Sequence, residues 1–155
     1  MLIALFIPIL VITNAYFCAS FAEGLENFPV AREFANLHLT DNLLAAVKTL
    51  SGVAGIYCIK NTITGCRYIG SSNNLGKRLK EHIFSSSNIH LQRAINLHGI
   101  APNSFLFIVI EFIERLPGVT LKEFQTLLVS RELIYLDWLF SLPADMRYNF
   151  LAQAG

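Results

Sequence analysis

The sequence predicts an α/β fold of the α+β kind, in which a small sheet packs with helices. Two short apolar and aromatic strings, each beside a glycine, flank a turn-forming segment, so residues 55–70 are typical of a β-hairpin. Apolar residues then recur at helical spacing in later segments, and a β-branched and aromatic run between two of them predicts a third strand. We expect one compact domain over residues 52–155.

The hairpin begins at Gly55-Ile56-Tyr57 and ends at Tyr68-Ile69-Gly70, with a turn predicted near Ile63. A turn at this position would place Tyr57 and Tyr68 nearly opposite each other. Because cross-strand partners share a face of the sheet, the two phenols are expected to converge on one patch. An ordinary aromatic cross-strand pair is the alternative, and the hairpin taken alone favours it.

A helix is predicted over residues 75–83, directly after four residues of helix N-cap type, Ser71-Ser72-Asn73-Asn74. Three apolar residues recur every four positions and form its core stripe: Leu75, Leu79 and Ile83. Arg78 and His82 share a neighbouring stripe. Arg can bind phosphate bidentately, and His can move a proton near neutral pH. Taken singly, each is more typical of a solvated helix position than of a binding site.

The later elements follow from the same patterns. Helical spacing predicts a helix over residues 89–98 that stops at Gly99, and the run at residues 105–110 predicts the third strand. Pro117-Gly118 then breaks the chain. Residues 121–140 predict a long, largely apolar helix that Pro143 terminates.

Glu132 lies among apolar residues of that last helix, so we expect it to be partly buried. A buried carboxylate needs a cation, a set of donors or a raised pKa. A salt bridge to Arg131 or to a nearby lysine is as consistent with the helix alone as a metal-binding role.

The segment from Gly55 to Asn149 resembles the GIY-YIG nuclease family, and within it the intron-encoded homing endonucleases of organelles, such as those of fungal mitochondria. The matching residues, in the family's order, are Gly55-Ile56-Tyr57, Asn61, Tyr68-Ile69-Gly70-Ser71-Ser72, Asn74-Leu75, Arg78-Leu79, His82, Leu91-Gln92-Arg93-Ala94, His98-Gly99, Arg131-Glu132 and Tyr148-Asn149. The resemblance implies a three-stranded antiparallel sheet flanked by helices.

The resemblance also implies that the chain hydrolyses a phosphodiester bond of DNA. Glu132 matches the family's single metal-binding glutamate, and an oxygen ligand of this kind suits a mostly hydrated Mg²⁺ or Mn²⁺ ion. Arg78 would stabilise the charge that develops on the phosphate.

Four further residues take catalytic roles by the same resemblance. Tyr57 would accept the proton of the attacking water, with Tyr68 or His82 assisting. A free phenol has a pKa of about 10, so Tyr57 would need the field of the arginine or the metal at neutral pH. Asn149 matches a residue that helps to order the site, and a turn asparagine is an equally good interpretation.

Composition alone does not indicate a nucleic-acid enzyme, because the net charge is only +1. Residues 55–93 nevertheless hold six basic side chains and one acidic side chain, whereas the segments on either side are net acidic. A local basic patch can hold a phosphate backbone, with modest and salt-sensitive affinity. The sequence contains no Gly-rich phosphate loop and no paired-cysteine zinc motif, and its 3 cysteines argue against a disulfide scaffold.

Residues 1–22 contain no charged side chain and form a hydrophobic leader long enough to span a bilayer. A secretory signal is a competing interpretation, although the usual positive residue near the amino terminus is missing. We favour a leader derived from an upstream exon, with the protein made in a mitochondrion. Residues 23–51 are predicted to be a connector, with loop character first and then a short helix capped by residues 40–42 and running to Leu50.

Two departures from the family leave alternatives open. His90 stands directly before Leu91 and does not fit the position of a further histidine found in many homing members. The sequence stops shortly after Asn149, so no separate DNA-binding region is visible. The chain would then be a weakly specific or homodimeric nuclease, or a relic that binds nucleic acid without turnover. A small membrane-anchored protein is the third interpretation.

Overall fold

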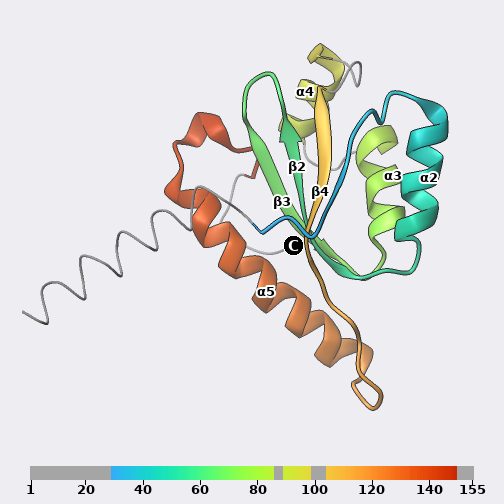
Figure 1. Cartoon of the computed structure of the whole chain (residues 1–155). Coiled ribbons are helices and arrows are strands. Elements are labelled where there is room, and N and C mark those ends of the chain that lie inside the picture. Colours follow the sequence, from blue (N-terminus) through green and yellow to red (C-terminus); the bar gives the residue numbers. More distant parts are fainter. Residues whose placement is uncertain (1–28, 86–88, 99–103, 150–155) are drawn as a thin grey trace, which may run out of the picture.

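The computed structural model describes residues 29–85, 89–98 and 104–149. The elements follow in the order β1 (Arg32–Phe34), α2 (Thr40–Leu50), β2 (Gly55–Asn61), β3 (Arg67–Ser72), α3 (Leu75–Ser85), α4 (Ile89–His98), β4 (Phe105–Phe112), α5 (Leu121–Ser141) and a 3-10 turn (Ala144–Met146). Figure 1 shows the sheet in the centre, with α2 and α3 side by side and the long α5 passing the other side. The predicted α+β class is confirmed.

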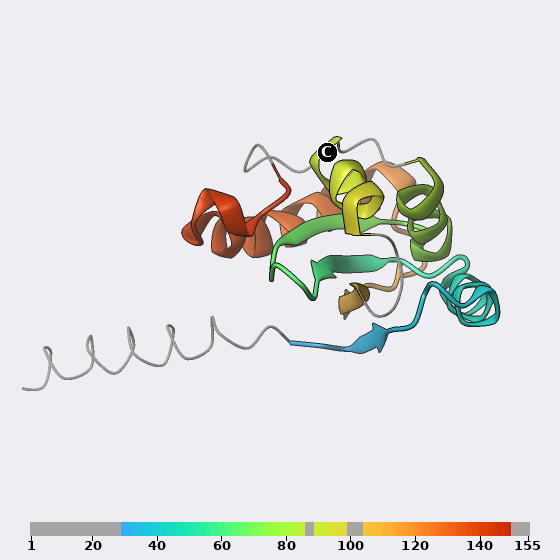
Figure 2. The ribbon, with the colours of Figure 1, turned by 90° about the horizontal axis from the view of Figure 1, so that it is seen from above.

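The sheet has four strands in the order β1-β4-β2-β3, and not the three that we expected. The additional strand, β1, lies in the segment predicted to be a connector and pairs antiparallel with β4, with Arg32 opposite Val109. Three residues are too few to show an alternating pattern, and the partner is distant in sequence, so the strand leaves no local signal. Figure 2 shows β1 and β3 at opposite edges of the sheet.

The sheet separates two apolar cores. Tyr57 and Phe107 point to one face, where they pack with buried residues of α2, α3 and α4; we call this the α3 face. Ile56 and Ile108 point to the opposite face and pack with Leu136 and other buried residues of α5; we call this the α5 face. The alternation along β2 and β4 therefore assigns every strand residue to one helix layer or the other.

Helix α2, predicted within the connector, forms from Thr40 to Leu50 and contributes Leu43, Ala46 and Leu50 to the core. Its contact with α3 is close, because a Cβ added to Gly76 would come within 2.5 Å of the Val47 carbonyl oxygen. This contact fixes the start of α3, and with it Arg78 and His82, relative to the sheet. The predicted domain boundary at residue 52 stays a prediction.

Helix α5 begins with a capping box, in which Thr120 and Glu123 exchange hydrogen bonds between their side chains and backbone N–H groups. In the described part of the chain, none of the helices combines the length and the apolar character that crossing a bilayer requires. The predicted hydrophobic leader at residues 1–22 lies outside the described residues.

Candidate active site

The two tyrosines lie on the same face of the hairpin but are not opposite each other, as the sequence had led us to expect. Tyr57 pairs with Gly70, and Tyr68 pairs with Ile59. The cross-strand pairs centre the turn between Ile63 and Thr64, slightly later than a turn at Ile63, and Asn61 Oδ1 accepts the backbone N–H of Ile63 there at 2.9 Å. The rings remain neighbours on a diagonal, with centroids 6.2 Å apart.

Gly70 leaves room for the Tyr57 ring. A Cβ at this position would lie 2.6 Å from the Tyr57 hydroxyl oxygen and 2.8 Å from Cζ. The glycine of the second motif thus allows the phenol of the first to cross the neighbouring strand towards the edge of the sheet. The side chain that uses the space above Gly70 is therefore Tyr57.

His82 completes an aromatic cluster with the two tyrosines. Its side chain is only 3% exposed, and its Nε2 lies 2.6 Å from the Tyr57 hydroxyl oxygen. The His82 ring also meets the Tyr68 ring edge-on, with centroids 5.1 Å apart. Burial, and secondarily the charge of Arg78, lowers the pKa of His82 to about 4, so the imidazole is neutral at neutral pH.

Both phenols resist ionisation. Burial raises the pKa of Tyr57 well above its ordinary value, and neighbouring Tyr68 and Glu132 add to the effect, whereas the Arg78 charge opposes it. Burial and Glu132 likewise raise the pKa of Tyr68. Neither side chain is a phenolate at neutral pH.

Arg78 stands one turn before His82 on α3 and remains partly exposed. Its Nη1 lies 3.2 Å from Glu81 Oε2 on the same helix, with both side chains well exposed to water. An exposed pair of this kind contributes little stability and can open for a phosphate. The Arg78 charge nevertheless acts on Tyr57, Tyr68 and His82, which places it beside the cluster.

Glu132 is 4% exposed and therefore more deeply buried than the sequence indicated. Its carboxylate accepts a hydrogen bond from the hydroxyl of Ser71 in β3. The Arg131 guanidinium, which the sequence left open as a partner, donates instead to Glu111 Oε2 at 2.8 and 3.1 Å.

Glu132 comes from α5, the helix on the opposite face of the sheet from the aromatic cluster. The two groups meet around an edge, because β3 is the last strand of the sheet and α5 packs along it (Figure 1). The carboxylate raises the pKa of both Tyr57 and Tyr68, so its field reaches the phenols despite the change of face.

Asn149 holds the outer edge of β3 without entering the aromatic cluster. Its side-chain amide donates to the Ile69 carbonyl oxygen and accepts the Ile69 N–H, both at 2.9 Å. Ile69 stands between Tyr68 and Gly70, so this pair of bonds fixes the backbone that carries Tyr68. The geometry agrees with an ordering role.

Sequence reasoning missed two contacts of the site. Ser71 was interpreted as a helix cap, whereas it binds Glu132, and it is Ser72 whose hydroxyl accepts the Asn74 N–H at 3.0 Å. Buried Asn61 binds the Tyr148 hydroxyl at 2.9 Å and so joins the turn to the chain end. Alternation from Tyr68 places Ser71 on the α5 face, and this was the available signal for its partner.

The described residues contain no group of three or more His, Cys, Asp or Glu side chains that could enclose a metal ion. A single buried carboxylate beside an edge suits an ion that keeps most of its water ligands and takes others from a phosphate, as Mg²⁺ does. Glu132 therefore fits the metal implied by the resemblance, as a lone protein ligand. His90, which we did not assign to the site, is exposed on α4.

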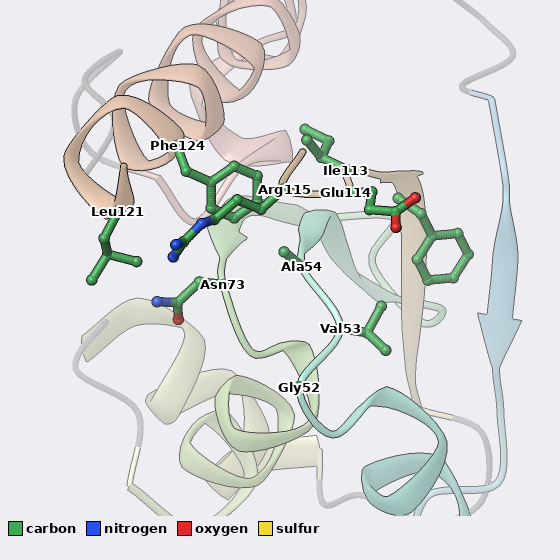
Figure 3. Close-up of a pocket in the computed structure, with 10 residues that line it drawn as sticks. Gly52, Val53, Ala54, Asn73, Ile113, Glu114, Arg115, Leu121 and Phe124 are labelled. Atoms are coloured by element: carbon green, nitrogen blue, oxygen red, sulfur yellow. The ribbon is translucent and has the colours of Figure 1, made fainter. Parts of the chain in front are cut away.

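A pocket of about 460 Å³ lies at the end of the sheet where β2 begins and β4 ends. Figure 3 shows Arg115 reaching into the space between Leu121 and Asn73, above the segment that leads into β2. None of the residues that line this pocket is one of the predicted site residues. The candidate site is therefore the cluster at the edge of β3.

Comparison with known proteins agrees with this geometry. The family model for the GIY-YIG catalytic domain matches residues 53–148. The chain is 35% identical over 78 residues to "Probable intron-encoded endonuclease 1" of Neurospora crassa, a match that covers 50% of this chain and 25% of that protein. The chain thus spans about a quarter of that curated relative.

Two solved structures are also similar. A mutant of the catalytic domain of intron endonuclease I-TevI shares 30% identity at a TM-score of 0.51, covering 66% of this chain and 99% of the solved one. A second structure of the catalytic domain of homing endonuclease I-TevI shares 31% identity, with a TM-score of 0.45 and coverage of 63% and 98%. Because the family model matches more than half of the chain, and both motifs stand on paired strands, the chain belongs to the GIY-YIG family and carries its catalytic domain over residues 53–148.

Proposed function

We propose that this chain is a metal-dependent DNA endonuclease of the homing type, which hydrolyses one phosphodiester bond at the edge of β3. The observation that carries the proposal is the contact of Tyr57 with His82, with Arg78 beside it and Glu132 within electrostatic reach. Family membership and the names of the similar proteins support the same reaction.

Tyr57 and His82 together can take a proton that neither would take efficiently alone. With its pKa raised, Tyr57 is a neutral phenol and is a weak base. His82 is neutral, and in the tautomer with a free Nε2 it accepts the Tyr57 proton across 2.6 Å. As Tyr57 passes this proton to His82, its oxygen takes one from the attacking water, so no free phenolate is required.

Arg78 and Glu132 would stabilise the negative charge of the reacting phosphate, Arg78 directly and Glu132 through the ion that it holds. The diester gains negative charge as water attacks, and a permanently charged guanidinium next to the phenols stabilises that charge. Glu132 would hold Mg²⁺ or Mn²⁺, and Ser71 fixes the orientation of its carboxylate. When bound, such an ion acts as a Lewis acid on the phosphate.

Cleavage of supercoiled DNA tests this function. We expect Mg²⁺-dependent nicking by the full chain, and a loss of at least about a hundredfold in Arg78→Ala and Glu132→Gln. Lys77→Ala and Glu123→Gln are matched controls on the same two helices, with exposed side chains, and should keep wild-type activity at saturating DNA. Equal activity in all variants would indicate a contaminant.

A second measurement separates activity from binding. Should DNA bind and remain intact with every divalent metal, the chain would be the non-catalytic relic that the sequence left open. Glu132→Gln should also abolish any rise in melting temperature that Mg²⁺ gives the wild type, because a ligand that binds only the folded state stabilises it.

The mitochondrial location remains part of the proposal. It is supported by the similarity to an intron-encoded protein of a fungus. The nucleotide sequence on either side of the reading frame tests it: an upstream exon of an organellar gene in frame with residues 1–22 supports this origin, and a nuclear promoter with its own start contradicts it. Membrane association through residues 1–22 and a homodimer stay predictions.

A further inference from the structure

Two arginines lie side by side where the chain end meets β3. Arg67, at the start of β3, and Arg147 form a parallel backbone bridge, and the Tyr148 N–H donates to the Arg67 carbonyl oxygen at 2.8 Å. Residues that pair in this way direct their side chains to the same face of a sheet. Neither arginine belongs to the catalytic cluster, and Arg67 directly precedes Tyr68.

Each guanidinium rests on an aromatic ring of α5. The Cζ of Arg67 lies 5.2 Å from the centroid of Trp138, and that of Arg147 lies 4.1 Å from the centroid of Phe140. Arg147 Nη1 also donates to the Leu142 carbonyl oxygen at 2.9 Å. Stacking restricts both side chains on the α5 face, so little conformational entropy would be lost when they bind a ligand.

The two charges have no carboxylate partner within the described residues. The ion pairs found there involve Lys77, Arg78 and Arg131 and neither of these two arginines. Asp145, two residues before Arg147, is not among the partners. Because no carboxylate neutralises either guanidinium, both remain available to an anion such as a backbone phosphate.

We infer that Arg67 and Arg147 form a second phosphate site, which binds the DNA backbone away from the bond that is cut. The inference rests on the proposed function. Ser71, which holds Glu132, stands four residues further along β3, and at roughly 3.3 Å per residue the separation is about 13 Å. With an axial rise of about 3.4 Å per nucleotide, this corresponds to about four nucleotides of duplex. The site would set the direction of the DNA along the edge of β3.

Salt-dependent binding of duplex DNA by the full chain, without divalent metal, tests the site. A neutral residue at one phosphate contact should weaken binding about fivefold at about 50 mM KCl and reduce the slope of log K against log salt by about one. We expect this of Arg67→Gln and of Arg147→Gln.

Arg32→Gln is the matched control. Arg32 also stacks on an aromatic ring, 5.1 Å from the centroid of Phe34, but it stands at the opposite edge of the sheet. The Arg32→Gln variant should show the wild-type slope of log K against log salt. Should Arg32→Gln lower the slope as much as the other two, the effect would be one of net charge, and the inference would be wrong.

Further variants separate binding from folding. Arg67→Met and Arg147→Met keep an aliphatic stem on the ring and lose the charge, so they should fold and show the reduced slope. Arg67→Lys and Arg147→Lys keep the charge and should show the wild-type slope. Unchanged slopes in both Met variants would overturn the inference while leaving the nuclease intact, whereas a wild type that neither binds nor cuts duplex DNA would overturn the proposed function as well.

Discussion

At the scale of single residues, the contact between Tyr57 and His82 links the protonation of the site to the stability of the fold. The imidazole is buried on the α3 face, and its pKa falls from 6.5 to about 4. The unfolded chain therefore binds a proton at His82 between about pH 6.5 and about pH 4, and the folded chain does not. This contribution of His82 is present above pH 6.5 and is lost as the pH falls through that window.

We predict that the free energy of unfolding decreases by about 1.4 kcal/mol per pH unit over this window because of His82. The difference in stability between wild type and His82→Gln should shrink by roughly 3 kcal/mol as the pH falls from about 6.5 to about 4. Urea unfolding at several pH values measures it. His90→Gln, which changes an exposed histidine of α4, should follow the wild-type curve. A constant difference between wild type and His82→Gln would contradict the burial argument.

Gly70→Ala tests whether the position of the Tyr57 ring matters for activity beyond its effect on the stability of the fold. The added methyl group meets the Tyr57 hydroxyl at 2.6 Å, so the ring must shift and its contact with His82 is disturbed. We expect a loss of about 1–3 kcal/mol in stability. Cleavage per folded molecule should fall about a hundredfold, because small displacements of catalytic groups are costly.

Gly76→Ala provides the comparison for that variant. Its methyl group overlaps the Val47 carbonyl oxygen at 2.5 Å, between α2 and α3, and does not touch Tyr57. It should lower stability and disturb the site only through a shift of α3, so we expect a smaller loss of activity per folded molecule than in Gly70→Ala. Equal activity per folded molecule in both variants would mean that Gly70 serves packing alone.

The sequence predicted that Tyr57 and Tyr68 share a face, but not how the candidate site residues meet. Tyr57 and Tyr68 were placed on one face correctly, because alternation survives a shift of two residues. Their register was wrong, because the turn, in which the Asn61 side chain accepts the Ile63 N–H, is centred later than a pairing of Tyr57 with Tyr68 requires. The deep burial of His82 and Glu132 depends on layers that form only in the folded chain, so helical spacing alone underestimated it.

At the scale of elements, β3 is an edge strand protected by the end of the chain. Asn149 satisfies both backbone groups of Ile69, which would otherwise face outward at the edge. Exposed edges of this kind pair readily with other chains. The same two bonds hold Tyr68 and Gly70 in place.

Asn149→Ala should therefore loosen β3 locally. Losing two hydrogen bonds should cost about 1–3 kcal/mol. Hydrogen exchange at the Ile69 amide should become faster than at the amides of β2, and cleavage should fall with it. Asn96→Ala, at an exposed amide of α4 that accepts from Gln92, should change stability by less than about 0.5 kcal/mol. An Ile69 amide as protected as in wild type would show that the two hydrogen bonds of Asn149 are not needed to hold β3 in place.

The elements with strong local patterns were predicted closely. The helix over residues 89–98 was placed correctly, and α5 ends one residue later than expected. Strand β1 was missed because its three residues gain their structure from β4 and from no pattern of their own. Short edge strands are defined by their partners, which a single sequence does not reveal.

At the scale of the whole molecule, the sheet lies between two layers of helices, and each layer carries different residues of the candidate site. The α3 face carries the aromatic cluster and Arg78, whereas the α5 face carries Glu132 and the stacked arginines. The proposed reaction needs both layers to meet at β3, so any change that tilts α3 or α5 relative to the sheet separates the catalytic groups.

Part of the α3 layer precedes the family's catalytic domain. Residues 29–52 lie before the match at residues 53–148, yet they supply β1, α2 and four buried core residues: Leu37, Leu43, Ala46 and Leu50. Burying a large apolar side chain contributes about 1.5–3 kcal/mol, and a whole domain is stable by only about 5–15 kcal/mol. These residues therefore account for a large share of the stability, and α2 also fixes α3 through Gly76.

We predict that a chain beginning at residue 53 does not fold as the chain beginning at residue 29 does. Without β1, β4 becomes an open edge, and without α2 the apolar side of α3 is exposed. Urea unfolding and amide NMR dispersion should show a cooperative transition for residues 29–155 and a broad or aggregating one for residues 53–155. Cleavage should be retained only by the longer chain. Matching transitions would mean that the family's segment is self-sufficient and that β1 and α2 are additions to its surface.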